Sequence, residues 1–502
     1  MPVTYHDLSS THLSEVPLNV VVIGSGSLLS SIHMNSMCVE SGIFPINNQL
    51  KTLSTISSTL TPSAEHGASA ETFFSVGDKM QRVAVCAIPT GCSRHNAPGR
   101  PHAVTDLVKA NKGSGELTVV LLNEDPASTS LSTACAVARA FPTYALKQNG
   151  PRESVVRVYL NFAGSYSCGT FNNLASSIQL CQKLVDMPPN ILHTDHFTEV
   201  AQSVAASLTE VGHAVNLTVI RGDELRERGM NGLFGVGQAA VHPSALVVLS
   251  YTPPTCDPAV PSVCMVGKGI VYDTGGLSIK TKEGMPGMKR DMGGSAGVLG
   301  AFQSLVLDGG SLKRPLHALL CLAENSVGPE ATRPDDIHVM YSGKTVEINN
   351  TDAEGRLVLS DGVAFASKHL NPSHIVDMAT LTGAQGIATG KRHAAVYTND
   401  ESLETLAVRM GRFSGDLVHP IPYCPEFFTV EFASAVADMK NSVACRTNAQ
   451  TSCAGQFIGN HLDSFLAKGG SWMHIDMAYP SHIGERATGY GVALLYTMVT
   501  NL

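Results

Sequence analysis

Residues 345–362 read TVEINNTDAEGRLVLSDG, and this stretch decides how the second half of the chain folds. Val346 and Ile348 alternate with polar residues as in a short strand, and the apolar residues that follow recur at helical spacing. Asp352 and Glu354 therefore fall at a strand-to-helix turn. Because open α/β sheets bind ligands at the carboxyl ends of their strands, we expect both carboxylates to face a site.

A plainer interpretation is that the two carboxylates cap the helix and neutralise its dipole, while Arg356 lies in solvent or pairs with Glu354 across one turn. A second stretch weakens this alternative. Residues 263–294 read VCMVGKGIVYDTGGLSIKTKEGMPGMKRDMGG, which predicts a buried strand at 263–266 and then a glycine-rich loop. That loop is expected to carry Lys268, Asp273, Lys280 and Asp291. Two lysines and two aspartates in so glycine-rich a segment indicate a site rather than a solvated face.

With these two stretches, the chain resembles the leucyl aminopeptidase family, the two-metal exopeptidases of the M17 type. The resemblance rests on GKG at 267–269, DTGG at 273–276 with Lys280, MKRDMGG at 288–294 and NTDAEGRL at 350–357. The sequences DMATLTGA at 377–384 and AEN at 323–325 add weaker support. Several spaced motifs in the right order are more specific than one short pattern. The match covers residues 180–500 well and the first 170 poorly.

The resemblance implies two divalent metal ions per subunit, Zn²⁺ and/or Mn²⁺ with Mg²⁺ as a further option. The implied ligands are Lys268, Asp273, Asp291, Asp352 and Glu354, with Asp273 and Glu354 bridging the ions. Carboxylate oxygens suit such cations, and four carboxylates balance the charge of two of them. Lys268 is the diagnostic ligand, because its amine has to lose a proton before it can bind a metal.

The resemblance also assigns two catalytic residues. Lys280 is expected to stabilise the oxyanion of the tetrahedral intermediate, and Arg356 to anchor a bicarbonate ion that shuttles the proton. The pocket for the first side chain is expected to be lined by Met288, Thr380, Leu381, Thr382 and Gly383. The implied activity is hydrolysis, by a metal-bridged hydroxide, of the first peptide bond of peptides with a neutral, leucine-like first residue.

Two alternatives stay open at this point. A dipeptidase specific for Cys-Gly would use the same ligands, and a catalytically silent binding or scaffold protein would keep the same fold. A histidine-zinc protease is disfavoured, because none of the nineteen histidines has the HExxH spacing. His474 is expected to be a core strand residue and not a ligand.

The length of 502 residues favours two domains. We expect an α/β protein with a smaller, macro-like α/β domain at 1–170, a linker helix at 171–190, and a catalytic domain at 191–502. The catalytic domain is expected to have a mixed central sheet covered on both faces, because several candidate strands are near-continuous apolar runs. Residues 51–70 are rich in Ser and Thr and predict a loop. The family resemblance implies a homohexamer, a dimer of trimers.

The net charge of −8 and the pI near 6.2 give no general attraction to nucleic acid or to an anionic membrane surface. The family resemblance implies peptides as partners, and the charge favours neither nucleic acid nor membrane. No apolar run near the start is long enough for a signal sequence or a membrane span. The twelve cysteines are scattered and form no CxxC unit, which indicates reduced thiols and predicts a cytoplasmic protein.

Overall fold

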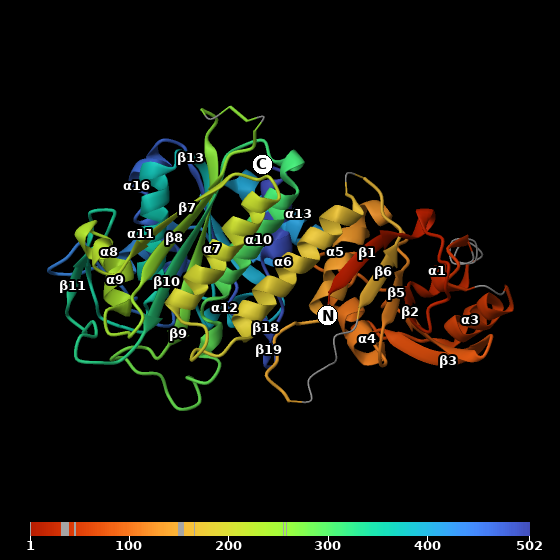
Figure 1. Cartoon of the computed structure of the whole chain (residues 1–502). Coiled ribbons are helices and arrows are strands. Elements are labelled where there is room, and N and C mark those ends of the chain that lie inside the picture. Colours follow the sequence, from red (N-terminus) through yellow and green to blue (C-terminus); the bar gives the residue numbers. More distant parts are fainter. Residues whose placement is uncertain are drawn as a thin grey trace. The chain divides into compact units, whose positions relative to one another are not determined.

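The computed structural model describes residues 2–31, 40–44, 47–148, 155–164, 166–254, 256–257 and 259–502 (Figure 1). The chain forms two compact units. The first unit comprises Met1–Gln179 and Met410–Leu417, and the second comprises Leu180–Arg409 and Val418–Leu502. Two helices, α6 (Cys168–Asp186) and α13 (Glu401–Ser414), have residues in both units.

The first unit is built on a six-stranded mixed sheet of order β1-β6-β5-β2-β4-β3. Its strands are β1 (Val3–Asp7), β2 (Asn19–Gly24), β3 (Ala68–Val76), β4 (Lys79–Ala87), β5 (Leu117–Leu121) and β6 (Val156–Leu160). Only β3 runs antiparallel to its neighbour. The helices η1 (Leu8–Ser10), α1 (Gly26–Ser30), α3 (Asn47–Thr59), α4 (Pro101–Asn111) and α5 (Pro126–Arg139) complete it. The predicted α/β character of this region is confirmed.

The predicted loop at 51–70 is wrong over more than half of its length. Helix α3 occupies residues 51–59, and strand β3 begins at Ala68. Leu50 and Leu53 are buried at helical spacing, and Ile56 packs against the same core. The many Ser and Thr residues in this segment have low helix propensity, so the sequence predicts a loop. The helix forms because burial of its leucines stabilises it more than this low propensity destabilises it.

The second unit contains an eight-stranded mixed sheet of order β15-β14-β17-β13-β9-β10-β8-β7. Its strands are β7 (Val215–Arg221), β8 (Ala245–Tyr251), β9 (Ser262–Asp273), β10 (Leu316–Asn325), β13 (Pro372–Ala379), β14 (Ala394–Thr398), β15 (Val418–Pro420) and β17 (Ser471–Asp476). The central strands β17, β13, β9 and β10 are parallel to one another. Smaller sheets join β11 (Ile337–Val339), β12 (Thr345–Glu347) and β16 (Met439–Lys440), and β18 (His482–Ile483) with β19 (Arg486–Ala487).

Helices cover both faces of the central sheet, as predicted (Figure 1). On one face, α10 (Gly293–Leu307) packs where Gly267 and Gly269 lie, and on the other α11 (Gly355–His369) packs against Val266. The remaining helices are α7 (Thr194–Glu210), α8 (Asp223–Glu227), α9 (Asn231–Gly237), η2 (Met288–Arg290), η3 (Gly309–Ser311), α12 (Ala384–Ala388), α14 (Pro425–Phe428), η4 (Thr429–Phe432), α15 (Gln450–Gly459), α16 (Asp463–Ala467) and α17 (Val492–Val499). Across the described parts of the chain, no helix is long and apolar enough to cross a membrane.

Strand β9 is longer than the sequence predicts. Lys268 and Asp273 lie within this strand and not in a glycine-rich loop. The glycines are needed because α10 approaches the strand closely: a Cβ atom on Gly267 would lie 2.5 Å from Cα of Ser295. The loop begins only after Asp273 and carries Lys280 and Asp291, as expected.

Candidate metal centre

The predicted site residues converge at the carboxyl ends of two neighbouring parallel strands. Asp273 is the last residue of β9, Asn325 is the last residue of β10, and the two are paired in register. Asp352 and Glu354 lie between β12 and α11, as predicted for a strand-to-helix turn. Glu354 is at the N-cap position of α11, but its side chain makes no capping hydrogen bond. The helix-capping alternative therefore does not account for this carboxylate.

Lys268 is buried among carboxylates. Its side chain is 3% exposed, and its Nζ lies 2.7 Å from Asp291 and 2.9 Å from Glu354. The same Nζ donates to the Thr380 carbonyl oxygen at 3.1 Å. Gly355 makes room for this side chain, because a Cβ atom there would lie 2.5 Å from Cε of Lys268. The lysine thus links β9 to the start of α11.

Lys280 joins the remaining two carboxylates. Its Nζ lies 2.8 Å from Asp273 and 2.5 Å from Asp352. One oxygen from each of Asp273, Asp352 and Glu354 falls within 4.8 Å of the others, a spacing that could hold a metal ion. The structure therefore brings all five predicted ligands and Lys280 into one cluster.

The electrostatics of this cluster favour additional positive charge. Burial raises the pKa of Asp291 well above its usual range, although Lys268 opposes the shift. Burial and the neighbouring Asp273 likewise raise the pKa of Glu354. Burial would lower the pKa of Lys268, but Asp291 and Glu354 outweigh it and raise that pKa. Four ionised carboxylates against two ammonium groups leave two negative charges uncompensated, so the donor set fits divalent cations.

Arg356 follows the cluster at the start of α11. Its Nη1 donates to the Asn441 carbonyl oxygen at 3.0 Å, and its buried Nε has no hydrogen-bond partner among the described residues. Burial lowers the pKa of its guanidinium to about 10, with Glu354 opposing the shift. Within the described part of the chain, Arg356 forms no ion pair with Glu354. A buried N–H donor without a partner is better explained by a bound anion than by the Arg356–Glu354 pair on the helix surface that the sequence also allows.

The predicted pocket residues lie on two segments beside the cluster. Met288 opens η2, three residues before Asp291, and is partly exposed. Thr380 is buried and donates from its Oγ1 to Asp291 at 2.8 Å. Leu381 and Thr382 are partly buried, whereas Gly383 is exposed. Thr380 therefore contacts the cluster of predicted metal ligands directly. Contact of these residues with a substrate stays a prediction.

Two residues that support the site were not singled out from the sequence. Asn325 donates to Asp273 at 2.8 Å and to the Thr351 carbonyl oxygen at 3.1 Å. Asp476 is fully buried and accepts hydrogen bonds from the backbone N–H groups of Leu381 and Thr382, as well as from Thr382 Oγ1 at 2.6 Å. Each of the two is the last residue of its strand. A polar residue at the carboxyl end of a predicted strand was the sequence signal that could have identified them as site residues. His474, as predicted, is a fully buried strand residue, and its Nδ1 contacts Asp377.

Known proteins are similar to this chain in sequence and in fold. Residues 179–496 match the family described as the cytosol aminopeptidase family, catalytic domain, and residues 19–150 match M17 aminopeptidase N-terminal domain 2. The chain is 52% identical over 425 residues to the Homo sapiens protein named Probable aminopeptidase NPEPL1, covering 82% of this chain and 79% of that protein. It is 44% identical over 420 residues to Leucine aminopeptidase 1 of Caenorhabditis elegans, covering 82% of each.

Two solved structures extend the likeness to the whole chain. The Caenorhabditis elegans leucine aminopeptidase LAP1 superposes with a TM-score of 0.88 at 36% identity, covering 100% of this chain and 98% of that one. Leucyl aminopeptidase from Leishmania major in complex with actinonin gives a TM-score of 0.90 at 36% identity, covering 100% and 95%. Together with the family match over most of the second unit, these likenesses confirm the resemblance stated from the motifs: the chain belongs to the M17 cytosol aminopeptidase family.

Proposed function

We propose that the protein is a metal-dependent aminopeptidase that removes a neutral, leucine-like residue from the amino terminus of peptides. The observation that carries the proposal is the buried cluster in which Lys268 and Lys280 hold four carboxylates together at the strand ends. Relatives named leucine aminopeptidase support it. Peptides are accordingly the proposed substrates.

The residues that would hold two divalent ions are Lys268, Asp273, Asp291, Asp352 and Glu354. When bound, such ions supply Lewis acidity, which lowers the pKa of water and polarises a carbonyl group. The carboxylates present hard oxygen donors to them, and Lys268 presents an amine in a buried position. The proposed metals are Zn²⁺ and/or Mn²⁺, with Mg²⁺ as the further option.

Lys280 is proposed to stabilise the negative charge that develops on the substrate carbonyl oxygen. Its pKa is raised because Asp273 and Glu354 outweigh the effect of burial, so its ammonium group is retained at neutral pH. A fixed ammonium donor in a partly buried site stabilises developing charge more than solvent does. Arg356 is proposed to hold bicarbonate, because its buried Nε has no partner among the described residues.

The loop Thr380–Gly383, together with Met288, is proposed to contact the first side chain of the substrate. Asp476 fixes the backbone of this loop through Leu381 and Thr382. Thr380 ties the same loop to Asp291. The substrate's first residue and its amino group would therefore be held by one connected framework, which is a requirement for productive orientation.

The deciding experiment measures release of the first amino acid from leucyl-p-nitroanilide and leucylglycine. Protein stripped of metal is expected to be inactive, and Mn²⁺ or Zn²⁺ to restore activity in the native chain but not in Glu354→Ala. Glu401→Ala, an exposed acidic position on α13, is the matched control. Release confined to Cys-Gly would replace the proposal with the dipeptidase alternative, and metal binding without any release would favour the scaffold alternative.

We further propose a cytoplasmic homohexamer, a dimer of trimers, that binds neither nucleic acid nor membrane. Relatives named cytosol aminopeptidase support the location. The eleven cysteines for which the structure gives a state are all free thiols, as expected in a reducing compartment. Light scattering on the purified chain tests the assembly: a particle near 52.9 kDa, the mass of one chain, would overturn the hexamer.

A further inference from the structure

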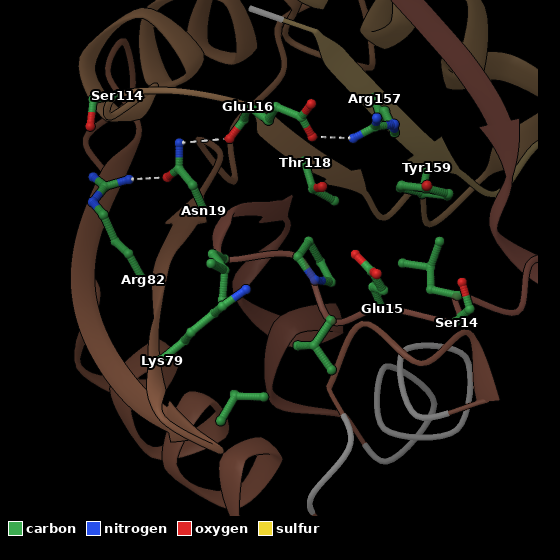
Figure 2. Close-up of a pocket in the computed structure, with 15 residues that line it drawn as sticks. Ser14, Glu15, Asn19, Lys79, Arg82, Ser114, Glu116, Thr118, Arg157 and Tyr159 are labelled. Carbon is green, nitrogen blue, oxygen red and sulfur yellow. Dashed lines mark hydrogen bonds and ion pairs between the residues drawn. The ribbon is translucent and has the colours of Figure 1, made fainter.

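A large cavity lies in the first unit. It encloses about 1000 Å³ and is formed near the amino ends of β2, β5 and β6 by strand residues and by the segment 13–19 (Figure 2). All of its lining residues belong to the first unit. Figure 2 shows Thr118 and Tyr159 on the strands, with Ser14 and Glu15 facing them from the segment that precedes β2.

Two hydroxyl groups without a partner in the described part of the chain belong to residues that line this cavity. Thr118 is 4% exposed and Tyr159 is 3% exposed, and neither hydroxyl makes a hydrogen bond to any residue that the structure describes. Neither hydroxyl oxygen is among the described polar atoms that are fully buried without a partner, so both remain accessible although their residues are largely covered. The pair is therefore available to a ligand that offers polar atoms to the strand wall.

The charged groups of the cavity are divided into paired and unpaired ones. Arg82 binds Glu71 through Nε and Nη2, and its Nη1 donates to Asn19 and to the Asn111 carbonyl oxygen. Arg157 pairs with Glu116 at 2.7 Å (Figure 2). Both guanidinium groups are thus already neutralised by neighbouring carboxylates or engaged with the protein.

Lys79 and Glu15 are the other two charged residues of the lining. Both line the cavity, and neither makes an ion pair or hydrogen bond within the described ranges. One free cation and one free anion match a ligand that carries both charges. A polyphosphate or nucleotide fits worse, because its negative charges would meet Glu15 and Glu116 while only Lys79 is free to balance them.

From this arrangement we propose that the cavity binds a short peptide with free amino and carboxyl termini. The ammonium group faces Glu15, the carboxylate faces Lys79, and the peptide backbone bonds to Thr118 and Tyr159. Apolar side chains of the peptide contact Val16, Leu18 and Val76, which also line the cavity. The volume is at the upper end of the ~300–1,000 Å³ typical of ligand pockets, so a single amino acid would not fill it.

The inference does not rest on the proposed aminopeptidase activity, because its test measures binding. The full-length chain carrying Glu354→Ala, which prevents turnover, is titrated calorimetrically with tetra-alanine, N-acetyl-tetra-alanine and tetra-alanine amide. Free tetra-alanine is expected to bind this cavity most tightly. Blocking either terminus is expected to weaken binding, because each modification removes one of the two charges.

Pocket variants in the same background locate the binding. Thr118→Val with Tyr159→Phe keeps the shape and removes both hydroxyls, and is expected to weaken tetra-alanine binding about tenfold. Glu15→Gln is expected to reduce discrimination against the acetylated peptide, and Lys79→Met discrimination against the amide. Lys51→Met and Glu65→Gln, at exposed positions of the same unit outside the cavity, are the controls and should bind as the parent does.

Each outcome of these titrations either supports or overturns the proposal. Losses in the pocket variants with unchanged controls support the site. Equal binding by parent and pocket variants, or no binding by the parent, overturns it, and tighter binding of ADP than of tetra-alanine overturns the ligand class. Lys79 and Glu15 are exposed, so their variants keep the test valid even if the buried double variant fails to fold.

Discussion

Asn325 Nδ2 donates to Asp273 Oδ1 at 2.8 Å, and this bond joins the last residues of two adjacent parallel strands. The amide also donates to the Thr351 carbonyl oxygen, one residue before Asp352. Asn325 thus fixes two of the proposed ligand positions without being a ligand itself.

Replacing Asn325 by leucine is therefore expected to weaken metal binding about 10- to 100-fold, the usual effect of losing a group that orients a ligand. The side chain keeps its approximate size but loses both donated bonds. Competition with a chromophoric chelator measures the affinity. Unchanged affinity would show that Asp273 is oriented by other contacts.

Lys280→Met is expected to lower kcat about 10²- to 10³-fold at saturating metal, because the lysine is proposed to act on charge that develops during the reaction. Initial rates with leucyl-p-nitroanilide measure the effect. Lys282→Met, at an exposed position two residues away, serves as the control. A loss confined to KM would contradict the oxyanion role.

Arg356→Met is expected to abolish any dependence of activity on added bicarbonate and to lower kcat. Its buried Nε is the donor left for an anion, and methionine removes the charge while keeping most of the side-chain volume. Rates are compared with and without bicarbonate in carbonate-free buffer. Arg392→Met, at an exposed position, should respond to bicarbonate as the native chain does.

Gly267→Ala is expected to destabilise the second unit by about 1–3 kcal/mol or more, because the added Cβ meets the backbone of α10 and not a flexible side chain. Denaturant unfolding measures the change. Gly310→Ala is the matched control, since a Cβ atom there would meet nothing within 4 Å. Equal stability of the two variants would contradict the close helix approach.

The stability of the second unit is expected to fall on mild acidification, in part through His461. Burial, helped by Lys344, lowers the pKa of His461 to about 3. Because the folded pKa lies below the unfolded value near 6.5, the stabilisation is complete above pH 6.5 and is lost as the pH falls toward 3. The loss at pH 5 is about 2 kcal/mol for this one group.

The measurement is the free energy of unfolding at pH 7 and pH 5 for the native chain and His461→Asn. The native chain is expected to lose more stability than the variant between these two values. His66→Gln, at an exposed position in the first unit, should behave as the native chain does. Parallel pH profiles for the native chain and His461→Asn would rule out the contribution.

The sequence was sufficient for the elements whose signals are local and strong. Strands such as β8 and β10 are near-continuous apolar runs, and the β12–α11 turn is marked by the change from alternating to helical spacing. Clustering of the two lysines with four carboxylates followed from family motifs, because residues so far apart in the chain show no local sign of proximity.

The failures have physical causes. Helix α3 was not predicted because its many Ser and Thr residues indicate a loop more strongly than its two leucines indicate a helix. The full length of β9 was not predicted because its glycines suggest a loop. Those glycines serve the packing of α10, a tertiary contact that no local pattern reveals. Asp476 was overlooked for a similar reason, since its importance lies in hydrogen bonds to residues about ninety positions earlier.

That distance has a consequence during synthesis. The loop Thr380–Gly383 is held by Asp476, the last residue of β17, and β17 pairs with β13 at the centre of the sheet. A nascent chain that has left the ribosome only as far as β14 contains every proposed ligand but lacks the residue that fixes this loop. The centre can therefore be completed only when translation is nearly finished, so truncated chains of this protein are expected to be inactive peptidases.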